Sequence, residues 1–296
     1  MPQPDLPAGA PPILQNAGAL LSRYHAVFCD VWGVVHNGIT AYTDACDALR
    51  TFRKAGGTVV LLTNAPVPEH RVETMLNMRH VPRDAWDAIV SSGAIALEHM
   101  IDQGFTSVYG IGPRDRDAAF FDKAAAKLVP LGEAQAIVAT GLDDDRSEVA
   151  EDYRPLLEDA LQRRLPFVCA NPDLVVDVGG TLYLCAGAIA DVYQHMGGEV
   201  FWAGKPHSSA YLTALAAAER VRGTAVAHDR VLVIGDALRT DLEGARRFGL
   251  DALFIAGGIH RDDVVIDGRL DPEKLESLFS APDAPGALGA MTQLKW

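Results

Sequence analysis

Short apolar segments alternate with helical segments along most of the chain. Runs this short, rich in Val, Ile and Leu, are typical of strands that are buried on both faces. Their alternation with helices predicts an α/β fold with parallel sheets. The expected strands cover 24–29, 58–62, 88–90, 107–110, 136–139, 167–170, 199–203, 231–234 and 252–255, and the expected helices include 44–55, 68–78, 120–128, 151–164 and 242–248.

The length and composition indicate a globular protein. At roughly 150 residues per domain, 296 residues predict two domains or one large one. The apolar runs are far shorter than the ~20 residues of a membrane helix. The N-terminal segment 1–20 lacks the basic and apolar stretches of a signal peptide, so we expect a cytoplasmic protein.

The charged and cysteine residues exclude further classes of function. A formal net charge of -13 disfavours nucleic acid as a partner, because nucleic-acid-binding proteins present a basic surface. The 4 cysteines form no Cys-x-x-Cys pair, which disfavours a structural zinc site or a disulfide framework. These features favour a small-molecule partner in a reducing compartment.

Polar residues follow several of the apolar runs. In open parallel sheets, ligands bind at the carboxyl ends of the strands. Taken singly, each of these residues could cap a helix or form a turn, but their occurrence at successive strand ends predicts a common site. The residues are Asp30, Thr63, Asn64, Lys205, Asp236 and Asp241.

The residue types suit phosphoryl transfer. Asp30 is a candidate nucleophile, and Asp236 and Asp241 supply the oxygen ligands that Mg²⁺ prefers. Thr63 and Asn64 offer hydrogen-bond donors to a phosphoryl group. A metal ion and the ammonium of Lys205 would offset the repulsion between the attacking carboxylate and the phosphoryl oxygens.

These segments resemble the motifs of the haloacid dehalogenase (HAD) superfamily. Asp30 matches the first motif, Thr63 the second and Lys205 the third, while Asp236 and Asp241 match the fourth. Their order and spacing resemble class IIA, the branch that includes NagD-type sugar phosphatases and 4-nitrophenylphosphatases. The segments GDALRTDLEGA (235–245) and Ala170-Asn171-Pro172-Asp173 are similar to signatures of that class.

The resemblance implies a Rossmann-like HAD core with a C2-type α/β cap, often dimeric through the caps. It also implies an Mg²⁺-dependent phosphatase of small phosphorylated metabolites that works through an aspartyl phosphate. The expected organisation is an N-terminal arm 1–20, a core formed by 21–80 and 196–280, a cap 81–195 and a C-terminal tail 281–296.

Roles for individual residues follow from the resemblance. Asp30 would be the nucleophile, and Thr63, Asn64 and Lys205 would hold the phosphoryl oxygens. Asp30, Asp236 and the backbone carbonyl of Trp32 would bind Mg²⁺, with Asp241 as a ligand or as its support. Asp173 is a further candidate for substrate contact, although an aspartate after a proline is equally typical of a turn.

Trp32 departs from the family pattern. The first motif is normally Asp-x-Asp, and its second aspartate acts as general acid and base. Tryptophan keeps the carbonyl but loses proton transfer, which is typically worth about 10²–10⁴-fold in rate. Three interpretations stay open: a phosphatase in which His36 or His260 moves the proton, a dehalogenase-type hydrolase, or an impaired protein that binds a phosphorylated ligand.

Overall fold

The computed structural model describes residues 9–178 and 181–296, which form two compact units. The first unit comprises Met1–Thr63, Glu73–Val90 and Tyr211–Trp296, and the second comprises Asn64–Val72 and Ser91–Ala210. The first unit therefore draws on both ends of the chain, and most of the second lies between them in sequence. Residues 1–8 of the expected N-terminal arm lie outside the described part.

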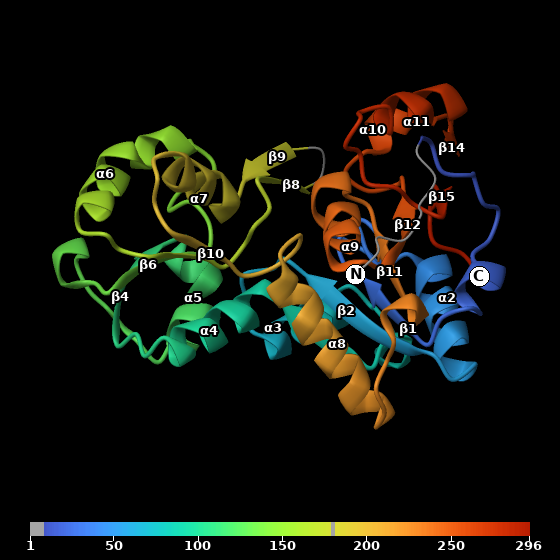
Figure 1. Ribbon diagram of the computed structural model, residues 1–296, viewed down its shortest axis with the longest axis horizontal. Coiled ribbons are helices and arrows are strands. Elements are labelled where there is room, and N and C mark those ends of the chain that lie inside the picture. The colour runs from blue at the N-terminus through green and yellow to red at the C-terminus, as the bar shows by residue number, and fades with distance from the viewer. Residues whose placement is uncertain (1–8, 179–180) are drawn as a thin grey trace. The chain divides into compact units, whose positions relative to one another are not determined.

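A six-stranded sheet forms the centre of the first unit, with the strand order β15-β12-β11-β1-β2-β3 (Figure 1). Strand β1 pairs in parallel with β11 and β2, and Cys29 lies opposite both Ile234 and Leu61. This register aligns the carboxyl ends of the three strands. The strands are β1 (Ala26–Cys29), β2 (Thr58–Thr63), β3 (Ala88–Ser91), β11 (Val231–Gly235), β12 (Asp251–Ile255) and β15 (Gly289–Met291).

Burial of the central strands confirms the prediction of an α/β fold. Every residue of β1, β2 and β11 is buried, as expected for parallel strands covered on both faces. Helix α2 buries Ala45, Leu49 and Phe52 at helical spacing and ends before Gly56, whose φ is 90°. Other helices with residues in this unit are α1 (Gly18–Leu21), α3 (Glu69–Met78), α8 (Ser208–Arg222), α9 (Glu243–Phe248), α10 (Arg261–Val264) and α11 (Pro272–Leu278); α2 covers Thr43–Lys54.

The second unit has its own parallel sheet, with the order β10-β7-β6-β4-β5. Figure 1 shows α6 and α7 on one face and α4 and α5 on the other. Leu157 of α6 and Ile189 and Tyr193 of α7 pack with Phe167 of β7 in one apolar core. The strands are β4 (Ser107–Ile111), β5 (Lys127–Leu128), β6 (Ala136–Ala139), β7 (Phe167–Cys169) and β10 (Val200–Trp202); the helices are α4 (Ser92–Asp102), α5 (Arg114–Lys123), α6 (Arg154–Gln162) and α7 (Ala186–His195).

Small antiparallel hairpins complete the architecture. One joins β8 (Val175–Val178) to β9 (Thr181–Leu184) in the second unit, and the other joins β13 (Val265–Ile266) to β14 (Arg269–Leu270) in the first. Within residues 9–178 and 181–296, every helix falls short of the length or the apolar content that a membrane crossing needs.

Two segments differ from what local sequence suggests. The helix expected over 120–128 runs instead from Arg114 to Lys123, because Lys127 and Leu128 pair with β4 as strand β5. Tertiary strand pairing here outweighs the helical propensity of the intervening alanines. The segment expected as a tail, 281–296, contributes strand β15, which pairs with β12.

We predict that the buried strands carry most of the stability of the first unit. Leu61 in β2 is 0 % exposed, so Leu61→Ala should lower the free energy of unfolding by about 2–5 kcal/mol. Leu212 is 56 % exposed, and Leu212→Ala should cost less than about 0.5 kcal/mol. Urea denaturation of the two variants checks this, and equal losses would contradict the assignment of the core.

Candidate active site

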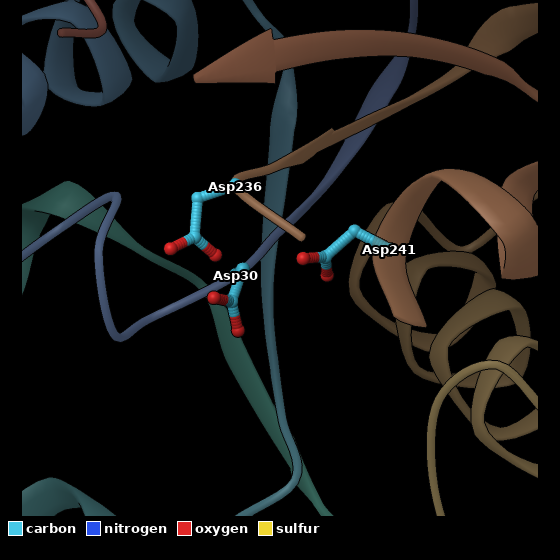
Figure 2. Close-up of side chains that lie close together, drawn as sticks. All are labelled: Asp30, Asp236 and Asp241. Atoms are coloured by element: carbon cyan, nitrogen blue, oxygen red, sulfur yellow. The ribbon is translucent and has the colours of Figure 1, made fainter. Parts of the chain in front are cut away.

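Three buried carboxylates meet at the carboxyl edge of the first unit's sheet. Asp30 follows β1, Asp236 follows β11, and Asp241 lies on the turn after β11 (Figure 2). One oxygen from each lies within 4.8 Å of the others, and the residues are 8 %, 5 % and 1 % exposed in that order. Thr63, the last residue of the neighbouring strand β2, is also buried. The structure thus brings the three aspartates together as the sequence predicts.

Glycines let the backbone approach Asp236 closely. A Cβ atom at Gly33, whose φ is 80°, would lie 2.1 Å from Asp236 Oδ2, and one at Gly258 would lie 1.8 Å from it. The backbone N–H of Ile259 donates a hydrogen bond of 2.7 Å to the same oxygen. No larger residue fits at either position without moving this carboxylate, so the glycines fix its place.

Asp241 is held by a π-helical turn, Leu238–Leu242. The backbone N–H of Ala237 donates to Asp241 Oδ2 at 3.2 Å, a hydrogen bond that helps to fix the carboxylate beside Asp30 and Asp236. Tyr211, which is fully buried, donates through its hydroxyl to the carbonyl of Asp241 at 3.1 Å. Gly244 makes room for that hydroxyl. Sequence reasoning missed Tyr211, because a buried tyrosine in a helix carries no signal of such a role.

The donor set fits a hard divalent cation. Carboxylate oxygens are the ligands that Mg²⁺ and Ca²⁺ take in proteins. Close, buried carboxylates also repel one another, so a cation among Asp30, Asp236 and Asp241 would remove an electrostatic cost. These three residues could therefore hold a divalent metal ion.

In the loop after Asp30, the side chain of Trp32 packs against two other residues of the loop, His36 and Gly38. The indole lies edge-on to the His36 ring, with 5.3 Å between ring centroids, and only a glycine fits beneath it at position 38. Gly38 N–H donates to His36 Nδ1 at 2.9 Å, and Arg79 Nε donates to the Gly38 carbonyl at 2.8 Å. The loop therefore fixes the ring of Trp32 through His36 and Gly38.

His36 is buried in the loop after Asp30. It is 2 % exposed, and burial, helped by the positive charge of Arg79, lowers its pKa to about 4. Its Nδ1 accepts the hydrogen bond from Gly38, which favours the neutral tautomer protonated on Nε2. The lowered pKa favours a neutral His36 ring at neutral pH. The interpretation that His36 replaces the missing acid stays a prediction, which the titration of His36 tests.

Two other residues of this unit are candidates for proton transfer: His260, which the sequence predicts, and Tyr42. His260 follows Gly258 and Ile259, and its Nδ1 lies 3.0 Å from Asp263 Oδ2. Burial raises the pKa of Tyr42; Asp236 raises it further, while Arg261 lowers it. The Tyr42 hydroxyl thus stays protonated at neutral pH. Sequence reasoning did not single out Tyr42, which begins no motif and lies in a loop.

The second unit brings together Asn64, Asp173 and Lys205. Asn64 Oδ1 accepts from the backbone N–H of Lys205 at 2.8 Å, and its Nδ2 donates to the carbonyl of Lys205 at 3.1 Å. The same Nδ2 donates to Asp173 Oδ1 at 2.9 Å. Asn64 and Lys205 are 4 % and 3 % exposed. The side-chain amide of Asn64 is thus engaged by the protein itself.

A separate cavity lies at the carboxyl end of β4. Its volume is about 600 Å³, and Tyr109, Arg114 and Asp143 are among its lining residues. The Arg114 guanidinium donates to the Gly110 carbonyl and lies over the ring of Phe121. None of the residues singled out from the sequence lines this cavity.

Comparison with known proteins supports one family. Residues 27–125 match the model of haloacid dehalogenase-like hydrolases, and residues 202–277 match a HAD-hydrolase-like model. A crystal structure of a hydrolase of the haloacid dehalogenase-like family from Brucella suis is 41 % identical, covers 95 % of this chain and 100 % of its own, and has a TM-score of 0.82.

Two further relatives are more distant. The 5'-nucleotidase YutF of Bacillus subtilis is 24 % identical over 255 residues, which are 85 % of this chain and 94 % of the relative. The crystal structure of 4-nitrophenylphosphatase from Thermotoga maritima is 19 % identical with a TM-score of 0.66, over 92 % of this chain and 95 % of that one. The likeness to the 4-nitrophenylphosphatase, at 19 % identity, shows a shared fold. The chain therefore belongs to the haloacid dehalogenase-like hydrolase family, with the fold of its class IIA branch.

Proposed function

We propose that this hydrolase is an Mg²⁺-dependent phosphatase that cleaves a small phosphate monoester through an aspartyl phosphate. The observation that carries the proposal is the cluster of Asp30, Asp236 and Asp241 at the ends of parallel strands in a HAD-like hydrolase. The relatives named as a 5'-nucleotidase and a 4-nitrophenylphosphatase support phosphate esters as the substrate class.

Asp30 performs the chemistry in this proposal. A carboxylate oxygen of Asp30 attacks phosphorus, the bond from phosphorus to the ester oxygen breaks, and the leaving oxyanion takes up a proton from water. Water then hydrolyses the acyl phosphate, releasing inorganic phosphate and regenerating the carboxylate. A divalent cation held by Asp30, Asp236 and the carbonyl of Trp32, with Asp241 as ligand or support, would neutralise charge on the phosphoryl oxygens.

Thr63, Asn64 and Lys205 would hold the phosphoryl oxygens, as the resemblance implies. Because the Asn64 side chain is bonded to Lys205 and Asp173, its contribution would come from its backbone N–H. The Thr63 hydroxyl would donate a second hydrogen bond, and the Lys205 ammonium would supply positive charge.

Trp32 determines which leaving groups the enzyme handles well. An alkoxide takes up a proton as it departs, and the indole of Trp32 cannot supply one at neutral pH as the aspartate of the family motif does. A leaving group of low pKa needs no such help. We therefore expect aryl phosphates to be cleaved faster than alkyl phosphates.

Asp30→Asn should abolish turnover while leaving the fold intact. Asparagine keeps the shape of the side chain but is not a nucleophile, so phosphate release from 4-nitrophenyl phosphate in Mg²⁺ should fall by more than about 10³-fold. The matched control, Asp102→Asn, changes an exposed aspartate of α4 and should retain full activity. Chelation of divalent ions should silence the wild type. If Asp30→Asn keeps the activity of the wild type, Asp30 is not the nucleophile. If the wild-type protein releases phosphate from no substrate, the ligand-binding interpretation is favoured instead.

Trp32→Asp should restore a general acid. We expect turnover of an alkyl phosphate such as glycerol phosphate to rise at least about 10-fold, with a smaller change for 4-nitrophenyl phosphate. Trp32→Asn is the control, because it makes the same cavity without adding an acid. An equal gain in both variants, or none in a folded Trp32→Asp protein, would assign proton transfer to Tyr42 or His260, and Tyr42→Phe would separate these two.

His36 should titrate near pH 4, well below the usual value of 6.5. Because folding lowers the pKa of His36, the unfolded chain binds a proton at this residue more tightly than the folded chain does between pH 4 and pH 6.5. His36 therefore contributes stability that is complete above pH 6.5 and is lost as the pH falls towards 4, on the order of 3 kcal/mol in total. Histidine-selective NMR, with His36→Gln to assign the signal, measures the midpoint. A midpoint between pH 6 and 7 would show instead that His36 can exchange protons during catalysis.

A further inference from the structure

The side chain of Asn64 forms a paired contact with the backbone of one residue, Lys205. Asn64 Oδ1 accepts from Lys205 N–H at 2.8 Å, and Nδ2 donates to Lys205 C=O at 3.1 Å. A primary amide that bonds both backbone groups of one residue fixes the position and the direction of that peptide segment. Both residues are almost fully buried, so water does not compete for these bonds.

Asp173 fixes the amide of Asn64 in turn. The second donor of Nδ2 bonds to Asp173 Oδ1 at 2.9 Å, and this charge-assisted bond sets which end of the amide faces Lys205 N–H. Asn171 Oδ1 accepts from the backbone N–H of Asp173 at 3.2 Å, which orders the segment that carries the carboxylate. Each polar hydrogen of the Asn64 side chain thus has a protein acceptor.

The surrounding backbone leaves little freedom for this arrangement. A Cβ atom at Gly204 would lie 2.5 Å from Asn64 Oδ1 and 2.5 Å from the hydroxyl oxygen of the buried Ser92. Glycine at 204 therefore lets the chain that leads to Lys205 approach Asn64 closely enough to bond. In sequence, Asn64 directly follows Thr63, the residue predicted to hold a phosphoryl oxygen.

We propose that Asn64, oriented by Asp173, is a positioning residue that fixes the backbone of Lys205 for phosphoryl transfer. This inference rests on the proposed function. The ammonium of lysine ends a flexible four-carbon stem, so its reach is set by where its Cα atom is held. Misplacement of a reacting or stabilising group by about 1 Å can cost about 10²-fold in rate. The inference also gives Asp173 a role that requires no contact with substrate.

Two single variants and one double variant test the proposed arrangement. Asn64→Asp keeps the acceptor for Lys205 N–H but removes both donors and places a second carboxylate beside Asp173. We expect kcat for 4-nitrophenyl phosphate to fall at least about 30-fold. In the double variant Asn64→Asp/Asp173→Asn, the amide at position 173 can donate to the carboxylate at position 64, so the bond between the two side chains forms with donor and acceptor exchanged. We expect kcat of the double variant to be about 10-fold higher than that of Asn64→Asp alone. Asp173→Asn alone removes the acceptor for Nδ2 and should lower kcat. Rescue in the double variant is a result that a general loss of stability does not produce.

Lys205 provides the second arm of the test. If Asn64 acts through Lys205, the effects of Asn64→Ala and Lys205→Ala on kcat will be strongly non-additive, and the double variant will resemble Lys205→Ala alone. Asn77→Ala is the matched control, because Asn77 is an exposed asparagine of α3, and it should leave kcat unchanged. Additive effects of the two alanine substitutions would overturn the proposal.

Hydrogen exchange at the Lys205 amide reports the contact without any turnover. Asn64→Ala should speed exchange of this amide at least about 10-fold, while Asn64→Asp should leave it protected. Unchanged exchange in Asn64→Ala, or faster exchange with unchanged kcat and unchanged affinity for inorganic phosphate, would overturn the proposal. If the wild-type protein neither releases nor binds phosphate with Mg²⁺ present, the proposed function fails. Because exchange of the Lys205 amide does not depend on turnover, it still tests the contact with Asn64 in that case.

Discussion

The mutual repulsion of Asp30, Asp236 and Asp241 is the constraint around which the first unit is organised. Their oxygens lie within 4.8 Å of one another at buried positions, where like charges repel strongly. Parallel pairing in register brings the ends of β1 and β11 together, and glycines at 33 and 258 let the backbone approach Asp236 Oδ2 closely. Backbone N–H groups bond to the carboxylates of Asp236 and Asp241, and a divalent cation would balance the charge of the cluster.

The second unit organises its polar residues differently. Asn64, Asp173 and the backbone of Lys205 are joined by hydrogen bonds that leave no donor of the Asn64 side chain for a ligand. In our proposals, the asparagine holds the backbone of the residue that carries the positive charge, while the three aspartates of the first unit bind a metal ion and Asp30 attacks phosphorus. Most of the polar residues that follow the strands therefore belong either to the acidic cluster of the first unit or to the hydrogen-bonded group of the second.

Much of the fold and the acidic site could be predicted from the sequence, because both depend on local patterns. Apolar runs predict β1, β2 and β11, and a polar residue after a parallel strand lies at a known edge of the sheet. Strand β5 and the strand within 281–296 could not be predicted, since each forms through pairing with a distant partner. The roles of Tyr211 and His36 depend on burial and on hydrogen bonds to neighbouring backbone, which no residue pattern encodes.

The central claim is that Asp30 becomes phosphorylated during turnover. The direct measurement is to mix the protein with Mg²⁺ and 4-nitrophenyl phosphate carrying isotopically labelled phosphorus, quench in acid and map the label by peptide mass spectrometry. We expect one labelled phosphoryl group on Asp30, released by hydroxylamine as expected for an acyl phosphate. Phosphate release without label on Asp30, or with label on another residue, would show that Asp30 is not the nucleophile.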